Sequence, residues 1–290
     1  MPIQVSDGFK LNAQEARQIG ESLAGEYCFA EPFPHIMLEN FLPADMVSGL
    51  KGHFPQEQLA SNVVFDLGYA GYHKRQINPA DCDEYCRAAF SFFNSQPFLE
   101  FLEGLSSIPG LVPDPYFLGG GFHEIGAGGK LGIHADFRIH PKLHLSRRMN
   151  VIIYLNEGWQ DAYGGSLELW ERDMSKMSRR IEPLWNRCVI FNTDATSYHG
   201  HPDPLTPPDG VLRRSIALYY YTASKTIYED VPNRETMYMA RPGDPAPIQR
   251  EAANLRLAQH LEQWVPPEVL RFSRRAIRRV KRAVRGRQQG

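Results

Sequence analysis

The sequence predicts a mainly β protein in which a barrel-like sheet is packed with helices. Two segments, 149–156 and 213–221, are runs of β-branched and aromatic residues with the length of a strand. His134 and Asp136 are two positions apart, so both side chains point to the same face if they lie on a strand. Polar residues placed among strands in this way fit a rolled sheet whose interior receives every second side chain.

Helices are expected on the N-terminal side of this sheet. Residues 11–26 are rich in alanine and glutamate and place apolar residues at helical spacing. Residues 32–42 have the pattern of a strand, and a helix over 43–53 follows, with proline in its first turn. Two further helices are predicted over 81–93 and 96–106, where they would cover the outside of the sheet.

Strands dominate from Tyr116 to Thr222, and the chain then continues through a proline-rich connector over 231–247 and a helix over 248–264. Four regions follow from this order. They are a helical and strand support region (1–109), the core sheet with the active site (110–225), a connector with a helix (226–265) and a basic amphipathic tail (266–290).

Composition sets the broad class of the protein. The chain has 290 residues, of which 42% are hydrophobic, and this is enough for one main domain with a full core. It has no apolar run of about 18 residues and begins without the pattern of a secretion signal, so we expect a cytoplasmic protein. The cysteines are scattered and are expected to be reduced thiols: Cys28, Cys82, Cys86 and Cys188.

Basic charge is concentrated at the C-terminal end. Residues 271–287 contain nine lysines or arginines and no acid, which leaves 23 basic against 33 acidic residues in the rest of the chain. Apolar residues recur at near-helical spacing within 270–287, as in a basic amphipathic helix. The sequence favours a solvated terminus and leaves open peripheral binding to an anionic membrane, at its inner surface, with nucleic acid as the least favoured partner.

Three side chains form a candidate metal site. His134 and Asp136 share a strand face, and His199 would complete the set from a distant strand. Two imidazoles and one carboxylate hold Fe(II) on one side and leave the other side open for oxygen and an organic co-substrate. His201 is a rival for His199; we favour His199 because Pro202 indicates that the strand ends near there.

Five elements in order carry a resemblance to a known family. They are His134 with Asp136, the sequence Tyr154-Leu155-Asn156, the sequence Gly164-Gly165-Ser166-Leu167, His199, and Arg213. From about Pro32 to about Thr222 the chain resembles the 2-oxoglutarate/Fe(II)-dependent dioxygenases, in their prolyl-4-hydroxylase-like branch. The resemblance implies a double-stranded β-helix of the jelly-roll or cupin-like kind, with Fe(II), 2-oxoglutarate and O2 as reactants and ascorbate as a candidate reductant.

The resemblance also implies a 2-oxoglutarate site. Its far carboxylate needs a planar, permanently charged fork, and Arg213 matches the basic position of the family. Arg214 is the alternative, because a slip of one residue would exchange the two faces. Tyr154 matches a position whose hydroxyl holds the same carboxylate, although a core aromatic is an equal alternative, and Asn150 lies four residues earlier on the same strand face.

Substrate contacts are harder to predict. A basic loop between Phe137 and Arg148 flanks the metal site. The sequence leaves two alternatives open: the loop recruits an anionic substrate, or it is a solvated loop whose charges serve solubility. His123 precedes a glycine-rich turn in a region where relatives often carry a tyrosine that contacts co-substrate or substrate. The residues that we expect at the substrate are His123, His140 and Arg138.

The predicted reaction is hydroxylation of an unactivated C–H bond, coupled to conversion of 2-oxoglutarate into succinate and CO2. His134, Asp136 and His199 are the residues that we expect to carry it. Peptidyl proline, free proline, glycans and lipid-linked acceptors remain open as substrates, and the oligomeric state is not readable from the sequence. A non-catalytic barrel that binds a ligand or partner is the main alternative, and a cupin-type isomerase or another dioxygenase without 2-oxoglutarate is a further one.

Overall fold

A computed structural model gives the arrangement of the chain. It describes residues 5, 9–223 and 236–262, with side chains as far as residue 257. The basic tail predicted for 266–290, its membrane-binding segment 270–287 and part of the predicted connector lie outside the described residues. The boundaries of the four predicted regions stay predictions.

The five helices lie close to the predicted ranges. The first begins after Asn12, whose side chain accepts a hydrogen bond from the backbone N–H of Glu15 at 3.0 Å, and α3 begins only after Asp83, which caps the N–H of Cys86 at 2.9 Å. No helix in the described part of the chain is both long and apolar enough to cross a bilayer. Their bounds are α1 Ala13–Cys28, α2 Ala44–Gly52, α3 Glu84–Phe93, α4 Gln96–Ser106 and α5 Ala246–Glu262.

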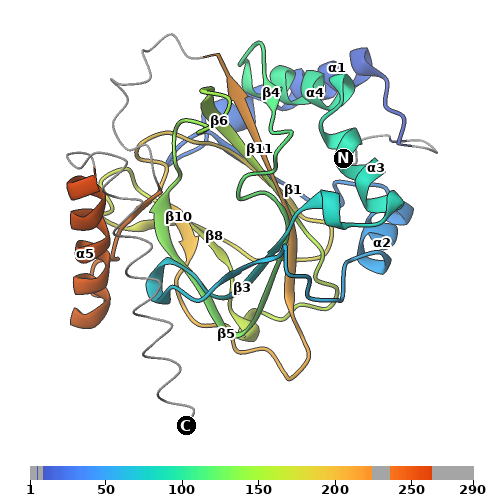
Figure 1. Ribbon diagram of the computed structural model, residues 1–290. Coiled ribbons are helices and arrows are strands. Elements are labelled where there is room, and N and C mark those ends of the chain that lie inside the picture. Colours follow the sequence, from blue (N-terminus) through green and yellow to red (C-terminus); the bar gives the residue numbers. More distant parts are fainter. Residues whose placement is uncertain (1–4, 6–8, 224–235, 263–290) are drawn as a thin grey trace.

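The strands form one antiparallel sheet that rolls around a central space (Figure 1). Its main path runs β1-β9-β6-β11-β5-β10-β7-β8, and this is the double-stranded β-helix that the sequence predicts. The bounds are β1 His35–Leu38, β2 Val63–Phe65, β3 Tyr72–Ile77, β4 Val112–Pro113, β5 Gly121–Ala135, β6 Ser146–Tyr154, β7 Leu167–Trp170, β8 Met177–Ile181, β9 Cys188–Asn192, β10 His199–His201, β11 Arg213–Thr222 and β12 Met237–Tyr238.

Alternation along the strands separates the core from the interior of the roll. On β6, Val151 and Ile153 belong to the main hydrophobic core, whereas Ile152 and Tyr154 line the inner cavity. The neighbouring β11 alternates in the same way, since Ser215 pairs with Tyr154 in the register. The period of two residues therefore gives each strand one apolar outer face and one chemically useful inner face.

The first four helices cover that outer face. Phe98 and Phe101 of α4 and Phe90 and Phe93 of α3 are fully buried or nearly so in the same core as the outer residues of β6, β9 and β11. Figure 1 shows α1 to α4 gathered on one side of the rolled sheet and α5 on the other. The helices stabilise the sheet from outside and leave its interior to the site.

Candidate metal centre and active site

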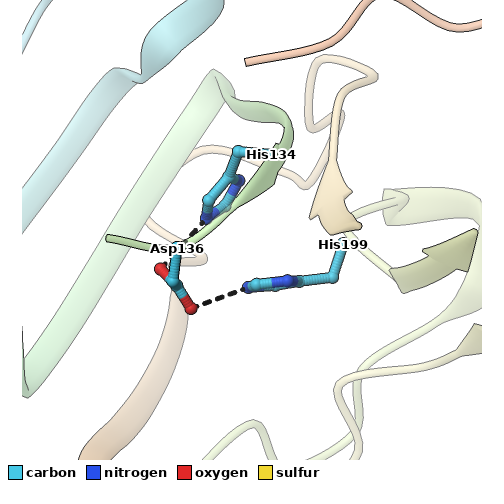
Figure 2. A group of neighbouring side chains, drawn as sticks. All are labelled: His134, Asp136 and His199. Atoms are coloured by element: carbon cyan, nitrogen blue, oxygen red, sulfur yellow. Dashed lines mark ion pairs between the residues drawn. The ribbon is translucent and has the colours of Figure 1, made fainter. Parts of the chain in front are cut away.

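The three predicted metal ligands come together at the inner wall of the roll. His134 lies near the end of β5, Asp136 follows directly after that strand, and His199 opens β10. The antiparallel register places His199 opposite His134. One ligand atom from each of the three side chains lies within 4.8 Å of the others, and Figure 2 shows both imidazoles directed at the carboxylate.

Backbone carbonyls fix the orientation of both rings. The Nδ1–H of His134 donates to the carbonyl of Gly132 at 2.8 Å, and that of His199 donates to the carbonyl of Ser197 at 2.9 Å. The Nε2 atoms then face the Asp136 carboxylate at 3.7 and 3.5 Å. A hydrogen bond at one ring nitrogen leaves the lone pair on the other, which is how proteins present histidine to a metal.

Burial keeps the two imidazoles neutral. Burial, followed by the charge of His199, lowers the pKa of His134 to about 3, although Asp136 acts in the opposite direction. Burial also lowers the pKa of His199. A neutral imidazole is the form that ligates a metal, so neither residue has to lose a proton before binding.

The carboxylate is held ionised by its own neighbours. Asn150 donates from Nδ2 to Oδ2 of Asp136 at 2.7 Å, and Nη2 of Arg147 lies 3.1 Å from the same oxygen. Burial alone would raise the pKa of Asp136, but Arg147 and the two histidines bring it below its ordinary value. Two buried, neutral imidazoles and one carboxylate that is 10% exposed, all lining the cavity, fit the ligand set that Fe(II) takes in facial-triad oxygenases.

A cavity of about 180 Å³ extends from these ligands into the roll. Arg213 lines it, with its Nε–H donating to the carbonyl of Gly165 at 2.8 Å and Nη2 lying 3.4 Å from the hydroxyl of Tyr154. Within the described part of the chain, no acidic side chain forms an ion pair with Arg213. The guanidinium is therefore placed for a carboxylate that none of the described residues supplies.

The register decides which of the two neighbouring arginines faces the cavity. Arg213 and Ile125 pair across β11 and β5, and both line the cavity. Arg214 pairs with Glu124 on the opposite face, where its Nε donates to the Glu124 carboxylate at 2.8 Å. The structure thus places Arg213 inside and Arg214 outside, as the sequence favours.

Asn150 lines the cavity but lies far from Tyr154, beside which the sequence predicts the carboxylate of 2-oxoglutarate. The sequence predicts Asn150 as a 2-oxoglutarate contact, but its amide lies between Asp136 and Arg147. Its Nδ2 donates to Asp136, and its Oδ1 accepts from Nε and Nη2 of Arg147 at 3.1 and 2.8 Å. The reason is geometric, because a separation of four residues on an extended strand carries Asn150 roughly 13 Å away from Tyr154. Arg147, expected in the basic loop, is buried within β6 and is paired with Asp136.

The residues expected at the substrate separate into two groups. His123 is buried and lines the cavity, with its ring Nε2 2.8 Å from the carbonyl of Gly119. His140 does not reach the cavity. It is fully buried, its Nδ1 accepts from the backbone N–H groups of Lys142 and Leu143, and its Nε2 lies 3.3 Å from Asp114.

The loop around His140 folds onto that imidazole rather than opening toward the site. Arg138 belongs to the same loop, is only half-buried, and does not line the cavity either. Neither His140 nor Arg138 lines the cavity, and their contact with the substrate stays a prediction. The short-range hydrogen bonds of His140 explain its position, because a buried ring needs partners and its own loop supplies them.

His201 remains in the strand instead of leaving the site. Strand β10 continues through it, and the side chain is buried and lines the cavity. Neither ring nitrogen has a hydrogen-bond partner among the described residues. It lies outside the group of three ligand atoms that converge, so the structure favours His199 over His201 as the metal ligand.

Lys74 on β3 and Tyr238 on β12 are among the cavity residues that sequence reasoning missed. Lys74 and Gln76 alternate with Arg75 in a six-residue strand, which is a weak signal for an inner face. No motif shows that this strand pairs with β5. Tyr238 pairs with His134 in the register, far along the chain from any recognised motif.

Two imidazoles and a carboxylate on the inner wall of a double-stranded β-helix, with an arginine in the same cavity, are the arrangement expected of a 2-oxoglutarate/Fe(II) oxygenase. The comparison with family models agrees. Residues 120–221 match the model of the 2OG-Fe(II) oxygenase superfamily. This segment is about a third of the chain, and it contains the three candidate metal ligands and Arg213.

Parts of the chain are also similar to individual proteins. The chain is 25% identical over 201 residues to the mouse protein named Prolyl 3-hydroxylase OGFOD1, covering 68% of this chain. It spans about a third (34%) of the length of that curated relative. A prolyl-4-hydroxylase structure from Pseudomonas putida matches with a TM-score of 0.50 and 21% identity, over 70% of this chain and 99% of the other. A prolyl hydroxylase structure from Trichoplax adhaerens matches with a TM-score of 0.49 and 18% identity, over 74% and 96% of the two chains.

Proposed function

We propose that this protein is a hydroxylase that uses Fe(II), O2 and 2-oxoglutarate. The observation that carries the proposal is the convergence of His134, Asp136 and His199 in the cavity that Arg213 also lines. Bound Fe(II) supplies the redox chemistry that converts 2-oxoglutarate and O2 into succinate, CO2 and a hydroxylated product. A binding module without turnover would not require all of these groups together.

The protein contributes orientation and charge to this reaction. His134, Asp136 and His199 would hold the metal through Nε2, a carboxylate oxygen and Nε2, because the Nδ1 atoms are committed to backbone carbonyls. Asn150 and Arg147 keep the carboxylate in place and ionised. Rigid ligands on one face of the metal leave the cavity side for the reactants.

Arg213 would hold the carboxylate of 2-oxoglutarate that is remote from the metal, with the Tyr154 hydroxyl beside it. Both groups are buried, so water competes little for the ion pair. The contact with Gly165 fixes the guanidinium in position. The co-substrate would thereby bind in one orientation, with its oxo acid end at the metal.

The proposal also concerns the substrate that receives the hydroxyl group. The name of the mouse relative makes a prolyl residue the first substrate to test, followed by free proline and by glycan or lipid-linked acceptors. His123 is the remaining predicted substrate residue that lines the cavity.

The test is release of succinate and CO2 from 2-oxoglutarate in the presence of Fe(II) and O2. The purified wild-type chain should show slow turnover even without its substrate. Arg213→Ala should lose at least a factor of ten, because a buried charged hydrogen bond contributes about 1.5 to 3 kcal/mol. Arg214→Ala is the matched control and should retain turnover, since Arg214 pairs with Glu124 outside the cavity.

Two outcomes would contradict the proposal. Metal-loaded protein that binds 2-oxoglutarate but never forms succinate, with any acceptor tested, would indicate the binding module. Equal turnover of Arg213→Ala and wild type would indicate an oxygenase or isomerase that does not use 2-oxoglutarate in this orientation.

A further inference from the structure

Lys74 lies in the cavity beside Arg213. It pairs with Ile125 across β3 and β5, while Arg213 pairs with the same residue across β5 and β11. The three side chains form a row on the inner face of the sheet, and all three line the cavity. Neighbouring strands are about 4.8 Å apart, so the two basic residues start roughly 10 Å from each other and extend into one space.

The Lys74 ammonium is buried without a counter-ion. The residue is only 9% exposed, and its Nζ lies over the ring of Phe65, 5.0 Å from the ring centroid. No carboxylate lies within ion-pair distance of Nζ among the residues that the structure describes. Lysine is rarely buried in this way without a partner, because its charge loses the hydration of bulk water.

Burial and then the neighbouring Arg213 lower the pKa of Lys74 to about 8, while Asp136 raises it.

The charges that line the cavity do not balance. Its basic residues are Lys74, Arg147 and Arg213, and its only acid among the described residues is Asp136. Arg147 and Asp136 pair with each other. Two cations are then left, and the proposed co-substrate is a dianion that must extend from Arg213 to the metal.

We propose that Lys74 is a second binding residue for 2-oxoglutarate. Its ammonium would donate to a carboxylate of the dianion, and this carboxylate would be its counter-ion in the cavity. His201 lies on the same wall, neither of its ring nitrogens has a partner among the described residues, and it is available as a hydrogen-bond partner for the same ligand. This inference rests on the proposed function, and it adds a residue from β3 to a site otherwise built from β5, β6, β10 and β11.

The test measures binding rather than turnover. Full-length protein is loaded with Mn(II) in place of Fe(II), and the dissociation constant for 2-oxoglutarate is measured by calorimetry for wild type and Lys74→Met. Loss of a charged hydrogen bond in a buried site should weaken binding roughly ten- to hundredfold. Lys142→Met is the matched control: Lys142 is exposed in the loop outside the cavity, and its replacement should leave the affinity unchanged.

The melting temperature without ligand separates binding from support of the fold. Methionine keeps most of the length of lysine and removes the unpaired buried charge, so the ligand-free Lys74→Met protein should melt at the same temperature as wild type or above it. Weaker 2-oxoglutarate binding together with unreduced stability is the expected combination. A residue with only a structural role would lower the melting temperature.

Unchanged affinity of Lys74→Met for 2-oxoglutarate would overturn the inference and leave the proposed function standing. If Lys74→Met does not fold, Lys74→Gln decides in the same assay by the same criterion. Failure of Mn(II)-loaded wild type to bind 2-oxoglutarate at all is a different result, because it would overturn the proposed function and this inference with it.

Discussion

His134 and His199 are prepared for a metal by the backbone around them. Each ring donates its Nδ1–H to a carbonyl two residues earlier, at Gly132 and Ser197, so the same local geometry is used on two strands. Both rings are neutral through burial, and Asp136 is ionised through Arg147 and Asn150. The site therefore carries the protonation states that metal binding requires before any metal enters.

Arg147 provides a direct test of this preparation. Arg147→Met removes the cation that lies 3.1 Å from Asp136 and should lower the affinity for Mn(II) or Fe(II) about 10- to 100-fold, as loss of outer contacts to a metal ligand typically does. Arg148→Met is the control, because Arg148 is the next residue and is exposed. Equal metal affinity of the two variants, measured by calorimetry, would show that Arg147 does not prepare the carboxylate.

At the scale of elements, helix packing outside the roll sets the stability of the site. Helices α1 and α4 approach closely at two glycines: a Cβ at Gly20 would lie 2.2 Å from the carbonyl oxygen of Phe101, and one at Gly104 would lie 2.5 Å from that of Arg17. Backbone atoms cannot move aside as a flexible side chain can. Close contact at these glycines is therefore a condition of the observed packing.

Two substitutions within α1 separate packing from helix propensity. Gly20→Ala should lower the free energy of unfolding by about 1–3 kcal/mol, because the helices must move apart. Gly25→Ala, with nothing within 4 Å of the added methyl group, should raise it by about 0.5–1 kcal/mol. Urea denaturation measures both. A loss of stability in Gly25→Ala equal to that in Gly20→Ala would contradict the packing argument.

The elements also show how far the sequence alone leads. Strands β6 and β11 were predictable because both are runs of β-branched and aromatic residues, and the spacing of His134 and Asp136 predicted that these two side chains share a face. Register between strands distant in the chain was not predictable. Lys74 enters the cavity only because β3 pairs with β5, and His140 is buried by hydrogen bonds within its own loop.

For the whole molecule, the buried histidines link stability to pH. Burial lowers the pKa of five of them below the ordinary value of about 6.5. The unfolded chain therefore binds more protons than the folded chain once the pH falls below about 6.5, and the free energy of unfolding must fall with it. The histidines concerned are His35, His123, His134, His199 and His201.

The free energy of unfolding of the metal-free protein should accordingly fall between pH 7.5 and pH 5.5. The lower pH is one unit below the pKa of an unfolded histidine, so each fully buried histidine should contribute a loss of roughly 1.4 kcal/mol. Urea denaturation at the two pH values measures the change. His201→Leu should lose less free energy of unfolding than wild type over this pH range, by about the contribution of one histidine. Equal stability at both pH values would contradict the burial of neutral imidazoles.

Binding of 270–287 to an anionic membrane stays a prediction for the whole molecule, since that segment lies outside the described residues. The roll itself concentrates three cations and four imidazoles around one acid, which fits a site for small anions and a metal. A polar interior and an apolar exterior covered by helices are thus two results of the same alternation along the strands.

Anaerobic titration with Fe(II) tests the central claim most directly. Wild type should bind one equivalent, and His134→Ala, Asp136→Ala and His199→Ala should each lose it, whereas His201→Ala should retain it because His201 lies outside the converging group. Undiminished binding in the first three variants, or loss of binding in His201→Ala with retention in His199→Ala, would contradict the account.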